Sequence, residues 1–323
     1  MRRRDFIELV AGSAVAWPIA AHAQQPAKRV GILSPAASEA AATLTAFREA
    51  IRGLGYIEGQ TIVLDFRLSK GIMDALPALA AELVRIPVDV IVTDSTSATL
   101  IAFAATHTIP IVMGATGGDP VALGLAKSLS RPGGNVTGTF FLAGLSDKRL
   151  QLLKQAFPGV QTVAVLANPK GAISVSELPK AELAAARMGI RLRSLAVSTP
   201  GELRALAPAA LSGSDGLLVM PDAVLWNNRA IIIDLASKAR LPAIYPEREY
   251  ADDGGLISYG ANVPDHFRQA AGYVDRIIRG TKPGDLPINA SSKFDFVINL
   301  RTARALGLSP SPDFTSAVNE VIE

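Results

Sequence analysis

The chain has 323 residues, of which 49% are hydrophobic and 19% are charged, and this composition excludes an intrinsically disordered protein. The formal net charge of +3 is small and gives no reason to expect a nucleic-acid partner. Cysteine is absent and there are only three histidines, which excludes disulfides, thiolate metal sites and cysteine nucleophiles and makes any metal site unexpected.

Residues 1–23 have the pattern of an export signal. Arginines at 2–4 are followed by an apolar stretch that Pro18 interrupts, and the Ala-His-Ala sequence at 21–23 is typical of a cleavage site. Residues 3–7, RRDFI, resemble the twin-arginine export motif, although an arginine precedes them where Ser or Thr is usual. We expect a cleaved signal peptide and a periplasmic protein. An amphipathic helix is the alternative, and twin-arginine export is favoured over general secretion.

The remainder of the chain alternates short apolar strands with amphipathic helices. The first set of predicted strands is Val30–Leu33, Thr61–Leu68, Val88–Thr93 and Ile109–Gly114, with helices near 36–54, 73–85 and 98–105. The second set is Val163–Asn168, Ile190–Val197, Asp215–Pro221, Pro242–Pro246 and Gly254–Gly260, again separated by helices. Strands that alternate with helices indicate doubly wound parallel sheets, so we predict an α/β protein with two such lobes.

Glycine and proline are concentrated over 114–144, which we interpret as the passage between the lobes, with a helix over 121–129 inside it. Beyond the second set of strands the pattern predicts an amphipathic helix over 263–279 and a last strand and helix over 294–306. This final stretch is too short for a domain, so we expect it to pack over both lobes. The predicted lobes are 28–140 plus about 262–290, and 141–261 plus about 291–323.

Polar residues follow two strands of the first lobe: Ser34 the first, and Asp94, Ser95, Thr96 and Ser97 the third. In open parallel sheets, ligands bind beyond the carboxyl ends of the strands. The polar run after the third strand begins a helix, where free backbone N–H groups and a partial positive charge favour a carboxylate. Helix capping alone explains one hydroxyl but not the whole run. We therefore predict a ligand site here, with Asp94 available to an ammonium group.

The other candidate binding residues lie at the ends of further strands: Gly114, Asp119, Asn168, Asp222, Tyr245 and Tyr259. Asp119 precedes Pro120, and a helix N-cap is its alternative role. Asp222 is a second candidate partner for an ammonium group. The two tyrosines are predicted to cover the apolar part of a solute, and Trp226 and the pair Phe140–Phe141 are further candidates for an aromatic wall, although such rings are more often core.

No catalytic signature is present in the chain. The patterns G-x-S-x-G, H-E-x-x-H, G-x-x-x-x-G-K-[ST] and G-x-G-x-x-G are all missing. We therefore expect no catalytic residue, no cofactor and no enzyme activity. Two lobes with small polar loops at their strand ends are typical of a receptor that closes on a solute.

Several segments resemble a family of ABC-transporter substrate-binding proteins that includes tryptophan and tyrosine receptors. The segments are Ile109–Gly138, Lys148–Pro169, Leu241–Asn262 and Lys293–Leu308, in the family's order. The motifs D-P-V-x-x-G-L, R-P-G-G-N-x-T-G and F-x-x-V-I-N-L-x-T-A are specific in combination. The resemblance implies a type I periplasmic-binding-protein-like fold, with a hinge of several crossings and a ligand cleft between the lobes.

The resemblance also implies a function. It implies a receptor that closes on a solute and delivers it to an inner-membrane ABC permease. Together with the residues above, it leads us to expect a monomeric periplasmic receptor for a small carboxylate-bearing solute, an amino acid or aromatic acid. The family's loop at the position of Asp94–Ser97 contacts ligand, but commonly reads T-P-A where this chain has D-S-T-S, so the solute itself is not carried over. The alternatives are a receptor for a membrane kinase and an exported hydrolase or isomerase. A repressor lobe is least favoured, because an export signal replaces the DNA-binding head.

Overall fold

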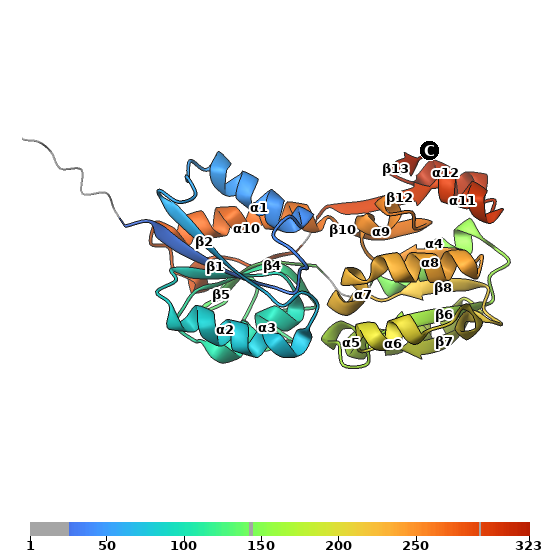
Figure 1. The fold of residues 1–323 in the computed structure, drawn as a ribbon, viewed down its shortest axis with the longest axis horizontal. Coiled ribbons are helices and arrows are strands. Elements are labelled where there is room, and N and C mark those ends of the chain that lie inside the picture. The colour runs from blue at the N-terminus through green and yellow to red at the C-terminus, as the bar shows by residue number, and fades with distance from the viewer. Residues whose placement is uncertain (1–25, 142–144, 291) are drawn as a thin grey trace, which may run out of the picture.

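The computed structural model describes residues 26–141, 145–290 and 292–323, which form two α/β lobes side by side (Figure 1). The expected export signal lies outside these residues. No helix in the described part of the chain has the length and apolar character needed to cross a bilayer.

The first lobe is built on a six-stranded sheet in the order β11-β5-β4-β3-β1-β2, with every neighbouring pair parallel. The strands are β1 (Lys28–Ser34), β2 (Ile62–Leu68), β3 (Val90–Thr93), β4 (Ile111–Gly117), β5 (Val136–Phe141) and β11 (Asn289–Ala290). The helices are α1 (Ala42–Gly53), α2 (Leu76–Arg85), α3 (Thr96–Ala105) and α10 (Val263–Ile278). Helices α1 and α10 cover one face of the sheet and α2 and α3 the other (Figure 1). Strands β3 and β4 are therefore buried along their whole length, which explains their continuous apolar sequences.

The second lobe is built on a seven-stranded sheet in the order β13-β12-β10-β9-β8-β6-β7, in which β10 and β12 are antiparallel and the other pairs parallel. The strands are β6 (Thr162–Ala167), β7 (Arg191–Ala196), β8 (Gly216–Val219), β9 (Ala243–Tyr245), β10 (Ile257–Ala261), β12 (Phe294–Asn299) and β13 (Glu320–Ile322). The helices are α4 (Ser146–Ala156), α5 (Ala172–Arg187), α6 (Pro200–Ala205), α7 (Ala223–Asn227), α8 (Arg229–Lys238), α9 (Arg248–Asp252), α11 (Leu300–Leu306) and α12 (Pro312–Ala317). Separate apolar clusters pack on the two faces of this sheet.

The chain passes between the lobes at three points: after β5, between β10 and α10, and after β11. Helix α10 returns to the first lobe, where it packs against α1 and β4. The segment that follows the second set of strands thus contributes to both lobes. The doubly wound architecture predicted from the sequence is confirmed.

The helix predicted over 121–129 is wrong, because the chain forms turns there. The Gly124 N–H donates to the carbonyl of Val121, and Gly124 has a φ of +73°, a left-handed conformation that ends a right-handed helix. Strand β5 lies within the segment 114–144, which we interpret from the sequence as the passage between the lobes, so no strand is predicted there. Its Gly138 has a φ of +123°, and a Cβ there would lie 2.5 Å from the carbonyl oxygen of Met113 on β4. The glycine that weakens the strand pattern is thus required by the close approach of the two strands.

Candidate functional site

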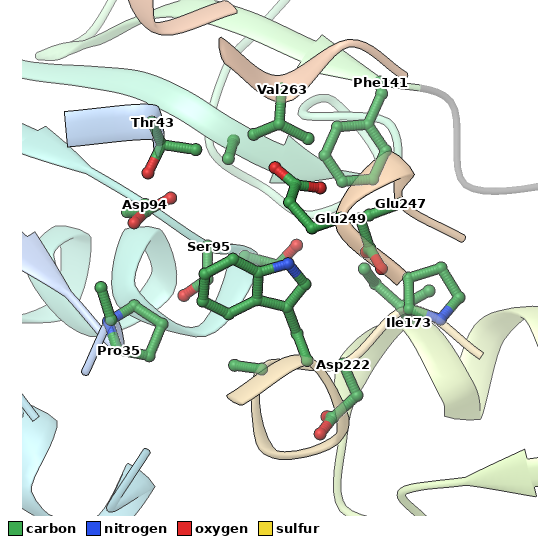
Figure 2. A pocket seen from close by; sticks show the side chains of 16 residues that line it. Pro35, Thr43, Asp94, Ser95, Phe141, Ile173, Asp222, Glu247, Glu249 and Val263 are labelled. Atoms are coloured by element: carbon green, nitrogen blue, oxygen red, sulfur yellow. The ribbon is translucent and has the colours of Figure 1, made fainter. Parts of the chain in front are cut away.

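A cavity with about 660 Å³ of empty space, part of it open to solvent, lies between the two lobes (Figure 2). From the first lobe it is lined by Pro35, Ala36, Thr43, Asp94, Ser95, Thr96, Ala115, Phe141 and Val263. From the second lobe it is lined by Ile173, Pro221, Asp222, Ala223, Trp226, Glu247 and Glu249. Among the described residues, no group of three His, Asp or Glu side chains could hold a metal ion.

The position of the cavity follows from the strand directions. Residues 35–36 follow β1, residues 94–96 follow β3, and Pro221 and Asp222 lie just beyond the end of β8. The carboxyl ends of parallel strands lie at one edge of a sheet, where loops leave a crevice for ligands. In this protein those edges of the two sheets face the same space.

The N-terminus of α3 forms one wall of the cavity. Ser95 is its N-cap, and Ser95 Oγ accepts a hydrogen bond from the N–H of Ala98 at 3.0 Å. Thr96 Oγ1 is tied to Gly117, donating to its carbonyl oxygen at 3.2 Å and accepting from its N–H at 2.9 Å. These hydroxyls hold the loop in place. The first N–H groups of a helix have no partner within it, so this wall can accept an anion.

Asp94 lies beside this wall and is held from behind by Ser34. The fully buried Ser34 Oγ donates a hydrogen bond to Asp94 Oδ2 at 2.6 Å. Burial raises the pKa of Asp94 to about 7. The bond from Ser34 opposes this shift, the negative charge of Glu249 adds to it, and the nearby Thr43 hydroxyl also opposes it. Ser34 does not itself line the cavity, so its role in the structure is to orient Asp94.

Asp222 lies on the opposite wall as the N-cap of α7. Its Oδ1 accepts hydrogen bonds from the N–H groups of Val224 at 2.8 Å and Leu225 at 3.2 Å. Its Oδ2 accepts one from Asn168 Nδ2 at 3.0 Å. Burial raises the pKa of Asp222, and these hydrogen bonds oppose the shift. Asn168 is buried behind Asp222 and does not line the cavity.

Besides Ser34, three candidates from the first lobe lie outside the cavity. Gly114 is covered by α10, since an added Cβ would lie 2.8 Å from Cζ of Phe267, and its lack of a side chain serves packing. Asp119 is exposed, and its Oδ1 accepts a hydrogen bond from the N–H of Val121 at 2.8 Å, so it stabilises a turn. Ser97 belongs to the first turn of α3 but does not line the cavity.

Neither candidate tyrosine lines the cavity. Tyr245 is 1% exposed and stacks on Tyr250 with ring centroids 4.7 Å apart, inside the core of the second lobe. Tyr259 packs between Phe294 and Phe296, with centroid distances of 6.1 and 5.6 Å. Successive side chains of a strand point to opposite faces of the sheet, so a place near a strand end does not direct a ring toward the ligand edge.

The cavity obtains its aromatic surface from Trp226 and Phe141 instead. Both belong to the aromatic residues that the sequence offered as further candidates. The sequence-based prediction missed Glu247 and Glu249, which follow β9 and begin α9. The position of Glu247 immediately after Pro246, at the end of a strand, was the signal that could have identified it.

The packing role of Gly114 leads to a testable prediction. Gly114→Ala forces a methyl group against the ring of Phe267, and we expect it to lower the free energy of unfolding by about 1–3 kcal/mol. Solute affinity should not change, because residue 114 does not line the cavity. Urea unfolding and calorimetric titration measure the two quantities. The control is Gly53→Ala, where an added Cβ meets nothing within 4 Å. A variant with native stability and lost affinity would contradict the assignment.

The lobes also touch each other beside the cavity. Asn227 Nδ2, on the second lobe, donates a hydrogen bond to the carbonyl of Pro35, on the first, at 3.0 Å. On the opposite side, a Cβ added to Gly117 would lie 2.6 Å from Cδ1 of Ile173. The structure therefore has its lobes in contact around the cavity, and Asn227 supplies a polar link between them.

Asn227→Ala removes this link, and we expect a loss of solute affinity of about 3- to 10-fold, the value of one neutral hydrogen bond. Most of the loss should appear as faster dissociation, because the link forms only when the lobes meet. Stopped-flow kinetics measure the rate. The matched control is Asn228→Ala, since Asn228 Nδ2 donates within its own lobe, to the carbonyl of Val224. Equal dissociation rates for the two variants would show that the link plays no part in closure.

Comparison with known proteins agrees with this geometry. A family model described as ABC transporter substrate binding protein matches residues 29–321. A tyrosine-binding protein of Clostridioides difficile (strain R20291) is 28% identical over 262 residues, which cover 81% of this chain and 75% of the relative.

Solved structures show the same fold. A conserved domain protein of Vibrio cholerae superposes with a TM-score of 0.85 at 27% identity, over 91% of this chain and 99% of the other. An ABC domain of Streptococcus pneumonia in complex with L-Trp gives 0.84 at 23% identity, over 92% and 100% of the two chains. A ligand-free, open substrate-binding protein with adhesive properties from Clostridium difficile gives 0.64 at 28% identity, over 91% and 99%.

Proposed function

The chain belongs to the family of ABC transporter substrate-binding proteins, and from that premise we propose that it captures an amino acid in the interlobe cavity for import. Members of this family bind solutes and are not enzymes. We further propose that the protein is exported to the periplasm, as the pattern of residues 1–23 suggests, and that it acts as a monomer which presents its solute to a membrane permease.

One observation carries the choice of an amino acid: the cavity offers an anion site, acidic side chains and an aromatic surface together. The N-terminus of α3 would hold the carboxylate through its free N–H groups. Asp94 and Asp222 stand on the two walls as partners for an ammonium group. Trp226 and Phe141 would cover an apolar side chain. The C. difficile relative, named for tyrosine binding, supports this class of solute.

The other solute class considered from the sequence, an aromatic acid, fits less well. An aromatic acid without an amino group carries only negative charge. It would place that charge beside the carboxylates of Asp94, Asp222, Glu247 and Glu249, and like charges repel. An amino acid brings a positive group to the same place. The geometry therefore favours an amino acid over an aromatic acid.

A thermal-shift screen tests the proposal. The purified protein without its first 23 residues is heated with each L-amino acid and with a series of benzoate-type acids. A solute that binds only the folded state raises the melting temperature by mass action. We expect at least one amino acid to raise it and the benzoates to have no effect. A shift with benzoates only, or with none of the compounds, would overturn the proposal.

A further inference from the structure

Every ionisable side chain among the described residues that line the interlobe cavity is acidic: Asp94, Asp222, Glu247 and Glu249. Asp94 comes from the first lobe and the other three from the second, so the fold alone assembles them (Figure 2). No Lys, Arg or His is among these lining residues. The cavity thus carries one sign of charge, and the low-polarity surroundings of a cleft strengthen its field.

None of the four carboxylates forms an ion pair with a cation of the described chain. Asp94 and Asp222 accept only from neutral groups, the Ser34 hydroxyl for the first and the Asn168 amide with backbone N–H groups for the second. Glu247 Oε2 is buried with no hydrogen-bond partner at all. All four residues are partly buried, and a charge that is shielded from water without a partner is costly.

Two arginines lie nearby, and neither forms an ion pair with a carboxylate of the cavity. Arg229 forms an ion pair with Asp253, with 2.7 Å between Nε and Oδ2, and its guanidinium lies 4.9 Å from the centre of the Trp226 ring. Arg149 lines an adjoining cavity that also contains Glu247, and its Nε donates to the carbonyl of Tyr259 at 2.7 Å. Even if Arg149 is counted against Glu247, and the charge that Arg229 shares with Asp253 against Glu249, no cation lowers the pKa of Asp94 or Asp222.

Burial and the lack of counter-charges raise the pKa values of these carboxyl groups. Burial raises the pKa of Glu247 to about 8, and the charges of Glu249 and Asp222 add to the shift while Arg149 and Arg229 oppose it. Burial likewise raises the pKa of Glu249. With the value of about 7 for Asp94, protons neutralise part of the negative charge of the cavity near neutral pH. A bound cation would replace them.

A second observation points to a ligand in the same space. Thr43, on α1, lines the cavity and is only 6% exposed. Its hydroxyl lies close enough to Asp94 to lower the pKa of that carboxyl, but its buried Oγ1 makes no hydrogen bond of ordinary geometry. Figure 2 shows it close to Asp94. A buried hydroxyl that makes no hydrogen bond costs free energy, and a ligand N–H placed between these two side chains would remove that cost.

We infer that the solute is net cationic: an amino acid with a basic side chain, whose α-ammonium group is held by Asp222 and whose second nitrogen lies among the carboxylates of Asp94, Glu247 and Glu249. The inference rests on the proposed function and narrows it to a substrate class. A zwitterionic amino acid brings equal positive and negative charge, so it would not reduce the net negative charge of the carboxylates that line the cavity. The rings of Trp226 and Phe141 suit the methylene chain of a basic side chain and attract its cation.

Matched pairs of amino acids test the inference by calorimetric titration. L-Arginine is compared with its neutral near-isostere L-citrulline, and L-lysine with L-norleucine. L-Tyrosine and L-tryptophan are also titrated, because they are the zwitterionic amino acids in the names of similar proteins. We expect the basic member of a pair to bind at least about 10-fold more tightly, the effect of one charged hydrogen bond. Titration in two buffers that differ in ionisation enthalpy should show proton release with the basic member.

Variants locate the effect in the cavity. Glu249→Gln, and separately Asp94→Asn, should move the affinity ratio of the basic to the neutral member toward one. Asp119→Asn, which removes an exposed carboxylate outside the cavity, should leave the ratio unchanged. Circular dichroism melting confirms that each variant folds. If citrulline, norleucine or tyrosine binds as tightly as arginine and lysine, the inference is overturned and the proposed function stands. If no amino acid binds, both the inference and the proposed function are overturned.

Discussion

Trp226→Ala is expected to weaken binding of the best amino acid of the thermal-shift screen by about 30-fold or more. Trp226 is the larger of the two aromatic side chains that line the cavity, and truncation of a Trp that a ligand covers typically costs about 2 kcal/mol or more. The side chain is only half-buried and belongs to the five-residue helix α7, so the fold should survive the change. Calorimetric titration gives the affinity and thermal melting the stability.

Phe294→Ala is the matched control for this experiment. Phe294 is an aromatic residue of the same lobe that is 38% exposed and stacks on Tyr259 outside the cavity. The Phe294→Ala variant should bind the solute with native affinity. The Trp226→Phe variant, which keeps an aromatic ring in the cavity, should retain most of the affinity. Native affinity in Trp226→Ala would mean that the solute does not contact this ring.

The unliganded protein is expected to lose stability as the pH rises from about 6.5 to about 8.5. The pKa of Asp94 is raised to about 7 and that of Glu247 to about 8, whereas carboxyl groups in an unfolded chain titrate near pH 4. The folded state thus binds protons that the unfolded state lacks, and unfolding releases them. The stabilisation is complete below pH 4 and is lost as the pH rises through the folded-state values.

Urea unfolding at three pH values measures this effect. We expect the free energy of unfolding to fall by an amount on the order of 1–3 kcal/mol, with allowance for solvent screening. His266, whose pKa burial lowers to about 4, stays neutral in both states over most of this range, so its titration interferes little. The double variant Asp94→Asn, Glu247→Gln should have a flat profile. A native protein whose stability is constant or increases over the range would contradict the account of the acidic cavity.

Most of the fold could be predicted from the sequence, because buried parallel strands such as β3 and β6 are short continuous apolar runs bounded by breakers. The predictions were weaker where tertiary contacts decide the conformation. Gly138 interrupts the apolar pattern of β5, so the strand was not predicted. The close approach of β5 to Met113 requires a glycine at this position. Helices α7 and α9 have five residues each, too few for a periodic pattern to be visible. The resemblance to ABC transporter substrate-binding proteins is confirmed by the family match over 29–321.

The site was predictable in part. The rule that ligands bind beyond the carboxyl ends of parallel strands identified Asp94, Ser95, Thr96 and Asp222, all of which line the cavity. The rule does not give the direction of a side chain, and the structure places Tyr245 in the core. The rule could not predict the acidic character of the cavity, because Asp94, Asp222 and the pair Glu247 and Glu249 lie far apart in the sequence. They meet only when the N-terminal ends of α3, α7 and α9 face the same cleft.

The most direct test of the central claim is a crystal structure of the protein grown with L-arginine. The account predicts electron density for the amino acid between α3 and Trp226, with its carboxylate at the N-terminus of α3 and its side-chain nitrogens hydrogen-bonded to Asp94 or Glu249. Density for arginine elsewhere on the protein, together with an empty interlobe cavity, would contradict it.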